Sequence, residues 1–217
     1  MVSFWTDSMG GKGERTRAAI LASTADLMNR GGFLGVPIAD VLDASGLQKG
    51  GLYRHFASRE ALTLAAFDHA VGQIRARFLE AVKTQRGARA QLLALLSAYR
   101  PFKVDTPLVG GCPIMNAAIE SDHASAVLCA RARDAMDGWR SLVASILRKG
   151  QTEGEVAPEI DVNDTTSVII GCLEGAVMLT QLYRSPSHLS AAVGHLERFI
   201  LDDVCPATEK SNERRLP

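Results

Sequence analysis

The stretch Ile38–Phe56, IADVLDASGLQKGGLYRHF, has the pattern of two short helices joined by a sharp turn. The first segment carries apolar residues at helical spacing, and in the second segment Leu52 and Phe56 lie four apart on one face. Between them stands Ser45-Gly46, where glycine can adopt the positive φ that a tight interhelical turn requires. The stretch therefore predicts a helix-turn-helix whose outward residues can reach a DNA groove.

The longer segment Gly46–Leu62, GLQKGGLYRHFASREAL, resembles the signature of the tetracycline-repressor family of bacterial transcription regulators. The similarity by motif extends from residue 14 to about residue 68, and beyond it the all-helical pattern and the chain length agree. The resemblance implies an all-α fold, with an N-terminal three-helix DNA-binding head and a C-terminal helical body that binds an effector and dimerises.

The distribution of breakers and helical patterns predicts the domain boundaries. Residues 1–12 contain glycines without a pattern and are expected to be disordered. Residues 13–60 are assigned to the helix-turn-helix domain, residues 61–205 to the effector-binding and dimerisation domain, and residues 206–217 to a loose tail. The connectors of the body carry the prolines and glycines, and no alternating strand pattern or repeat interrupts its helices.

Composition points to a chain without a membrane segment or a disulfide framework. The 217 residues have no net charge, but residues 1–86 hold 11 Lys/Arg against 8 Asp/Glu. That mild excess fits a head whose phosphate contacts come from a few placed residues. No apolar run is long enough to span a bilayer, and no signal peptide is evident. The four cysteines are widely spaced, so we expect cytoplasmic thiols and no metal site.

The resemblance also implies which residues contact DNA. Lys49 and Gln48, with Arg54, are expected to reach base edges, because lysine can donate to guanine and glutamine can pair with adenine. Tyr53 and His55 match phosphate-contacting positions of the family. The full set is Arg15, Thr16, Ala39, Gln48, Lys49, Gly50, Gly51, Tyr53, Arg54, His55 and Arg59. Arg59 belongs to it because a cation at a helix N-terminus opposes the macrodipole, which suggests a phosphate nearby.

Several residues depart from the family pattern. Pro37 stands where a hydroxyl residue usually binds a phosphate, and Ala39 can offer a base only an apolar contact. Gln48 is a poor N-cap, and Gly50-Gly51 costs about 1 kcal/mol per glycine relative to alanine. Two interpretations of these glycines stay open: a close approach of the backbone to DNA, or a helix held by tertiary contacts that tolerates glycine.

The last two predicted helices, Asp161–Tyr183 and Ser187–Val204, are apolar on more than one face. A helix that is apolar all round must be buried in a large core or in a subunit interface. The family dimerises through this pair as a four-helix bundle, and Gly171 and Gly175 leave room for a second helix. The expected interface residues are Ile169, Gly171, Leu173, Gly175, Leu179, Leu196 and Phe199.

Large apolar side chains of the body suggest a mostly apolar effector pocket. The candidates are Tyr99, Phe102, Cys112, Met115, Asn116, Trp139, Met178 and Tyr183, with Asn116 as a polar anchor. Cys112 precedes Pro113 at the start of a helix, where the dipole can lower a thiol pKa. An electrophile-sensing or oxidant-sensing cysteine and a buried structural cysteine are both compatible with this position.

We therefore expect a homodimeric regulator, most simply a repressor, that binds palindromic double-stranded DNA and is released by an apolar or aromatic small molecule. The alternative is a ligand-sensing or electrophile-sensing protein with weakened or altered DNA binding. An enzyme is disfavoured, because no nucleophile elbow, H-E-x-x-H or dinucleotide-binding turn is present, and no cofactor is indicated. The sequence does not identify the operator, the effector or the regulated genes.

Overall fold

The computed structural model describes residues 11–100 and 110–206, which form an all-α fold as the sequence predicts. The head consists of α1 (Lys12–Gly31), α2 (Ile38–Ser45) and α3 (Lys49–Tyr53). The remaining elements are α4 (Arg59–Lys83), α5 (Ala88–Tyr99), α6 (Pro113–Ser121), α7 (Ala126–Glu153), α8 (Val162–Tyr183), α9 (Ser187–Phe199) and a terminal π-helical turn over Ile200–Val204. Phe102 and the connector that contains it lie outside the described residues.

Helix α1 forms because one face of it supplies the core of the head. Ile20, Thr24 and Met28 follow helical spacing and are buried. The helix ends at Gly31, and Gly32 reverses the chain with a φ of +97°. Phe33 then enters the core fully buried, as its position after two glycines predicts.

The turn between α2 and α3 has the predicted geometry. Gly46 adopts the left-handed conformation, with φ +66° and ψ +21°. Its backbone N–H donates to the carbonyl of Asp43, which helps to close the end of α2. Leu52 on α3 and Phe56 after it are buried against the rest of the head. The polar face of α3 is consequently turned away from the core.

Helix α4 connects the head to the body. The Ser58 hydroxyl caps its N-terminus by accepting the N–H of Ala61 at 3.0 Å, as serine before the first turn of a helix commonly does. Phe67 on α4 packs edge-on against Phe33 of the head, with ring centroids 5.5 Å apart. Farther along, Phe78 and Val82 enter the core of the body. One continuous helix therefore belongs to both cores.

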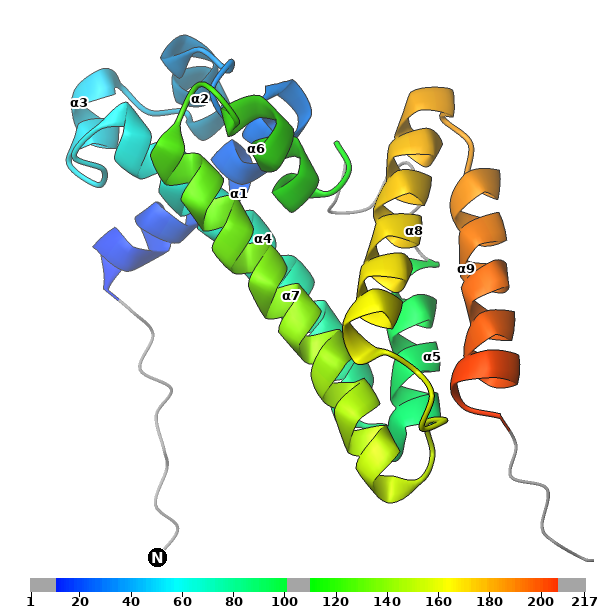
Figure 1. Cartoon of the computed structure of the whole chain (residues 1–217). Helices are drawn as coiled ribbons and strands as arrows, with labels where there is room; N and C mark the ends of the chain where they lie inside the picture. Colours follow the sequence, from blue (N-terminus) through cyan, green and yellow to red (C-terminus); the bar gives the residue numbers. More distant parts are fainter. Residues whose placement is uncertain (1–10, 101–109, 207–217) are drawn as a thin grey trace, which may run out of the picture.

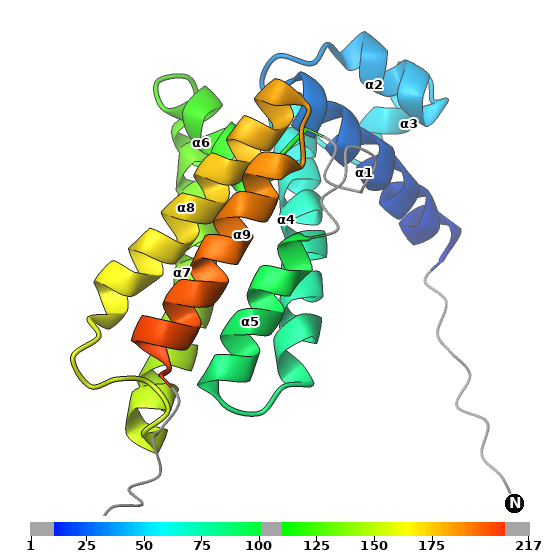
Figure 2. The same ribbon diagram turned by 90° about the vertical axis from the view of Figure 1, so that its right-hand side faces the viewer.

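The helices of the body lie roughly alongside one another (Figure 1). Helix α7 begins beside the head and runs to the far end of the body, α8 returns, and α9 runs away from the head again. Helix α6 sits at the head end, next to α1 and α4 (Figure 1). Figure 2 shows α8 and α9 side by side on one outer side of the body.

Helix α8 is long and apolar enough to cross a membrane, with a mean hydropathy of 1.4, which the sequence analysis did not anticipate. Nearly half of its apolar window, 44%, is buried inside the protein. Helix α8 packs against α7 and α9, and its threonines Thr165, Thr166 and Thr180 are also buried. Its apolar character is thus accounted for in part by the core, and the uncovered part is described below.

Candidate DNA-binding surface and effector cavity

Helix α3 lies at the outer edge of the head (Figure 1). Gln48, Lys49 and Arg54 are exposed, and Tyr53 is 37% exposed. His55 is half-buried. The proposed base-reading side chains are therefore accessible, whereas Leu52 on the same helix is buried.

No packing within the chain requires glycine in α3. A Cβ atom at Gly50 would have no atom within 4 Å, and a Cβ at Gly51 would meet only the Leu47 side chain at 3.7 Å, an ordinary contact. Gln48 is the N-cap residue, and its side chain makes no capping hydrogen bond. The glycines therefore weaken the helix without an intramolecular reason, which leaves a close approach to an external partner as one explanation.

Other candidate residues lie on the neighbouring helix ends. Arg15 and Ala39 are exposed, and Thr16 is half-buried. Arg17, which was not among the candidates, places its guanidinium 4.9 Å from the centre of the Phe56 ring. This cation–π contact joins the start of α1 to the end of the recognition segment.

Arg59 requires a correction. Its Nη2 atom donates to the carbonyls of Leu34 at 2.6 Å and Val36 at 2.8 Å, both in the connection between α1 and α2. The side chain is half-buried and ties α4 to the head. A cation at this helix start is therefore explained by two backbone acceptors, and the argument that a phosphate must compensate it no longer holds.

Glu120, near the end of α6, was missed by the sequence analysis. Its carboxylate accepts the backbone N–H groups of Phe33 at 2.6 Å, Leu34 at 3.0 Å and Gly35 at 3.2 Å. The donors are 85 to 87 residues away in the chain, so no local signal marks the contact. Glu120 and Arg59 bind the N–H groups and the carbonyls of the same short connection.

Asn116 is a second link between α6 and the head. Contrary to the prediction, it does not line the cavity described below. Its Nδ2 atom donates to the Gly110 carbonyl at 2.7 Å and to the Asn29 side-chain oxygen at 3.1 Å. Asn29 in turn donates to the Gly111 carbonyl at 3.0 Å. These bonds hold the start of α6 against α1, which is why the amide is unavailable as an anchor in the cavity.

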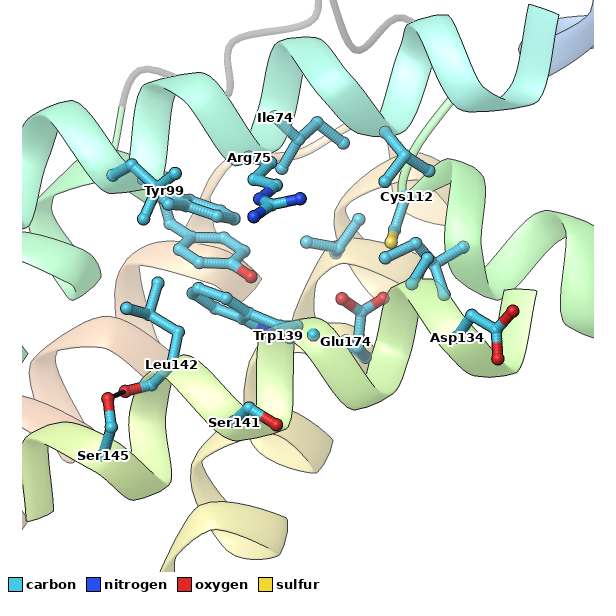
Figure 3. A pocket seen from close by; sticks show the side chains of 17 residues that line it. Ile74, Arg75, Tyr99, Cys112, Asp134, Trp139, Ser141, Leu142, Ser145 and Glu174 are labelled. Carbon is cyan, nitrogen blue, oxygen red and sulfur yellow. Dashed lines mark hydrogen bonds between the residues drawn. The ribbon is translucent and has the colours of Figure 1, made fainter. Parts of the chain in front are cut away.

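The body encloses a cavity of about 410 Å³. It lies between α4, α5, α7 and α8 and reaches the start of α6 (Figure 3). The residues that line it are Val71, Ile74, Arg75, Phe78, Leu79, Tyr99, Cys112, Ile114, Asp134, Ala135, Gly138, Trp139, Ser141, Leu142, Ser145, Glu174 and Val177. Of the predicted pocket residues, it brings together Tyr99, Cys112 and Trp139. Its size and mostly apolar lining suit a small organic ligand.

The other predicted pocket residues lie elsewhere. Met115 packs partly buried against the core without lining the cavity, and Met178 and Tyr183 point outward, 44% and 63% exposed. The Tyr183 ring lies 5.1 Å from the His188 ring. Large side chains alone did not reveal which helix face borders the cavity. A better signal was available in Glu174, an acid in the middle of the apolar helix α8.

Three aromatic rings form one wall of the cavity. Phe78 stacks on Trp139 with centroids 4.3 Å apart and on Tyr99 with centroids 5.0 Å apart. The interplanar angles are 19° and 23°. The rings come from α4, α5 and α7, so this wall is rigidly assembled from three helices and offers a flat apolar surface.

Cys112 and Glu174 lie near one another on the side of the cavity that is opposite the aromatic wall (Figure 3). Burial, together with the nearby Glu174 carboxylate, raises the pKa of the Cys112 thiol well above its ordinary value. The expected lowering by the helix start is therefore wrong, because desolvation outweighs the N–H groups of Ile114 and Met115. Burial also raises the pKa of the Glu174 carboxyl, although the hydrogen bond with the Cys112 thiol opposes that shift.

Two polar atoms at this cavity have no hydrogen-bond partner in the described part of the chain. They are Oε2 of Glu174 and the indole Nε1 of Trp139, and both atoms are buried. Trp139 as a whole is only 9% exposed. A buried donor or acceptor without a partner costs free energy, about 1–3 kcal/mol for a neutral group. The two atoms mark the polar part of the cavity lining.

An uncovered apolar stripe runs along α8. Of the eight exposed large apolar side chains among the described residues, four are on this helix: Val168, Met178, Leu182 and Tyr183. Gly171 and Gly175 lie between them at helical spacing, and a Cβ atom at either glycine would meet nothing within 4 Å. Within one protomer nothing approaches these glycines.

Part of the predicted interface set is wrong. Ile169, Leu173 and Leu196 are 3%, 1% and 1% exposed, so they belong to the protomer core and cannot form a contact surface. Leu179 and Phe199 are half-buried and border the surface. The sequence showed that α8 is apolar on several faces, but only the packing of α7 and α9 decides which face remains open.

Two segments of the chain match models of known protein families. Residues 88–196 match the family described as tetracyclin repressor-like, C-terminal domain, and residues 20–66 match the bacterial regulatory proteins of the tetR family. The chain is a TetR-family transcriptional regulator. The predicted family and function class are thereby confirmed, and the helix-turn-helix described above is the DNA-binding element of this TetR regulator.

Solved structures and curated relatives agree. A TetR transcriptional regulator from Chloroflexus aurantiacus is 40% identical with a TM-score of 0.86, covering 90% of this chain and 99% of its own. A TetR-family regulator from Cytophaga hutchinsonii is 28% identical with a TM-score of 0.83, covering 92% and 100%. An uncharacterised HTH-type regulator of Mycobacterium tuberculosis is 28% identical, covering 87% and 95%. The A-factor receptor protein of Streptomyces griseus is 24% identical, covering 88% of this chain and 64% of its own.

Proposed function

We propose that this TetR-family regulator is a homodimeric, non-enzymatic repressor in the cytoplasm, which binds a palindromic operator and leaves it when a small molecule fills the cavity. The observation that carries the proposal is that α4 and α6 each join the cavity to the head. Helix α4 starts at Arg59, bonded to the α1–α2 connection, and contributes Val71 and Phe78 to the cavity. Helix α6 starts with cavity residues and ends at Glu120 on the same connection.

A ligand that fills the cavity must press on both helices. Ile114 lines the cavity two turns before Glu120, so a shift of α6 by a bulky ligand moves the carboxylate that holds Phe33 and Leu34. Interiors are close-packed, so such a displacement is transmitted rather than absorbed. To move the head from 99% competent to 99% incompetent, the ligand needs a preference of about 5.5 kcal/mol for the second shape, which two cavities in a dimer share.

The α8 stripe supports the dimer. An exposed apolar face on a helix of a soluble regulator favours association, and a twofold axis at such a face repeats the same contacts on both subunits. Gly171 and Gly175 allow two such helices to approach closely. One relative is named A-factor receptor protein, and a receptor among the relatives supports ligand binding by this chain.

The test is a fluorescence-anisotropy titration of the full chain with the DNA upstream of its own gene and with random DNA of equal length. A preference for the upstream DNA that disappears in Lys49→Ala supports the proposal. Trp139→Ala should retain operator affinity and lose most of the response to any compound that releases the wild-type protein. Equal binding of both DNAs by wild type would instead favour a ligand sensor whose DNA recognition has weakened, the alternative suggested by Gln48 and Gly51.

A further inference from the structure

The charges around the cavity do not balance. Among the described residues that line it, Arg75 on α4, Asp134 on α7 and Glu174 on α8 carry a formal charge at neutral pH, so one basic group accompanies two acidic groups. Arg75 and Asp134 belong to the exposed residues, and Figure 3 shows the Arg75 guanidinium directed into the cavity. Glu174 lies deeper, and its Oε2 atom is shielded from solvent. In the described part of the chain, the cavity therefore holds a shielded acidic group that forms no ion pair.

Among the described residues, Arg75 is the cation that shares the cavity with this carboxylate, and the two do not form an ion pair. The neighbours of this carboxylate in the cavity are the Cys112 thiol and the Tyr99 and Trp139 rings, and burial raises the pKa of both Cys112 and Tyr99, so they stay neutral at physiological pH. The described residues include no ion pair to Glu174. A buried carboxylate without a counter-charge is costly, and a well-packed apolar residue would stabilise the fold better.

We propose that the cavity recognises a protonated aromatic or largely apolar amine, whose ammonium group pairs with the Glu174 carboxylate. This inference rests on the proposed function of the cavity as the effector site and names the chemical class of the effector. The Phe78, Tyr99 and Trp139 wall supplies a flat surface for the apolar part. Ring faces also attract a nearby cation, so the wall and the carboxylate favour the same ligand. A carboxylic acid of the same shape would meet an acidic group at the end of the cavity.

The binding test uses the full chain and three probes of one shape in isothermal titration calorimetry at pH 7.5: biphenyl-4-methylamine, biphenyl-4-methanol and biphenyl-4-carboxylate. Wild type should bind the amine about tenfold more tightly than the alcohol, because the ammonium adds an attraction between opposite charges to its hydrogen bond with the carboxylate, and the alcohol offers the hydrogen bond alone. In Glu174→Gln the amine should lose about tenfold and the alcohol should change less than threefold. Asp134→Asn, which removes the same charge at the exposed opening, is the matched control and should change amine affinity less than threefold.

Several outcomes would overturn the proposal. Equal affinities of amine and alcohol, tighter binding of the carboxylate, no binding of any probe, or equal losses in Glu174→Gln and Asp134→Asn would each do so. The readout needs no DNA, so operator binding can fail while the amine preference holds, and the reverse is also observable. The two proposals therefore fail separately.

Unfolding provides a second readout. Because burial raises the pKa of Glu174, the folded protein loses stability as pH rises through the window between the unfolded and the folded pKa of this carboxyl. Glu174→Gln should therefore melt at a higher temperature than wild type at pH 7.5, with a smaller difference near pH 4.5. A variant that is less stable than wild type at pH 7.5 would show that the carboxylate is compensated within the protein and would overturn the assignment.

Discussion

The carboxylate of Glu120 on α6 accepts the backbone N–H of Phe33 at 2.6 Å, although the two residues are 87 positions apart. Phe33 is fully buried in the core of the head and packs on Phe67 of α4. The contact thus joins the helix that begins at the cavity to a residue in the core of the head. On the proposed function, a shift of α6 should strain this bond.

Removal of this carboxylate should loosen the head. Glu120→Ala deprives three backbone N–H groups of their acceptor and should lower the free energy of unfolding by about 1.5–3 kcal/mol, the range for hydrogen bonds to charged groups. Operator affinity should fall and depend less on effector. The measurement is urea denaturation followed by circular dichroism, with Glu80→Ala as control, since Glu80 pairs only with Lys83 on the surface of α4. Equal stability of both variants would remove Glu120 from the coupling scheme.

The glycine at position 50 allows the two interpretations of α3 to be separated. Gly50→Ala meets open space within the chain and should stabilise α3 by about 1 kcal/mol through helix propensity. If the backbone approaches DNA closely, the added methyl group should nevertheless weaken operator binding at least several-fold. Thermal melting and anisotropy on the same preparation give both numbers. Higher stability with unchanged affinity would mean that the glycine is merely tolerated.

Lys49 and Arg15 should differ in the kind of DNA affinity that they provide. Lys49→Ala should reduce operator affinity by about 1–3 kcal/mol and relax preference at one base pair per half-site, as expected of a base contact. Arg15→Ala should weaken all sequences similarly and reduce the slope of log K against log salt by about one. Titrations at several salt concentrations with operator and random DNA measure both effects. If Lys49→Ala weakened binding to operator and random DNA equally, Lys49 would contact the phosphate backbone of DNA instead of a base.

The α8 stripe should be sensitive to bulk at its glycines. Gly175→Leu should separate two packed copies of α8 and yield monomers, while each protomer should keep its fold because a Cβ atom there meets no atom within 4 Å. Gly72→Leu is a matched control, since Gly72 also sits in a helix with open space around it, on α4. Sedimentation velocity reports the mass. A dimer that persists in Gly175→Leu would place the interface elsewhere.

Cys112 should behave as a protected thiol. Its pKa is raised by burial and by Glu174, so the thiolate fraction at pH 7.5 is smaller than in an unfolded chain and grows only at strongly alkaline pH. Alkylation by iodoacetamide, followed by peptide mass spectrometry, should therefore modify Cys112 more slowly in the folded protein than in guanidinium chloride. Rapid alkylation of Cys112 in the folded protein would instead support an electrophile-sensing role for this cysteine.

Local patterns in the sequence determined the helix-turn-helix and the all-α class. The left-handed Gly46, the Ser58 cap and the buried Leu52 and Phe56 followed from spacing and residue chemistry, because turns, caps and apolar stripes act over a few residues. The predicted domain boundary at residue 60 falls inside α4. This helix contributes to both cores, so the boundary between head and body could not be read from local signals.

Only the tertiary structure decided which faces of the body helices border the cavity, the core or the open surface. Leu173 and Leu196 proved to be core residues, and Met178 and Tyr183 proved to be exposed, because neighbouring helices rather than residue type cover each face. The contacts of Arg59 with the α1–α2 connection explain the cation that its sequence position had assigned to a phosphate, and the contact of Glu120 with the same connection had no local signal. The charge of Glu174 was visible in the sequence, but its consequence depends on burial between α7 and α8, and desolvation is a property of the packed chain.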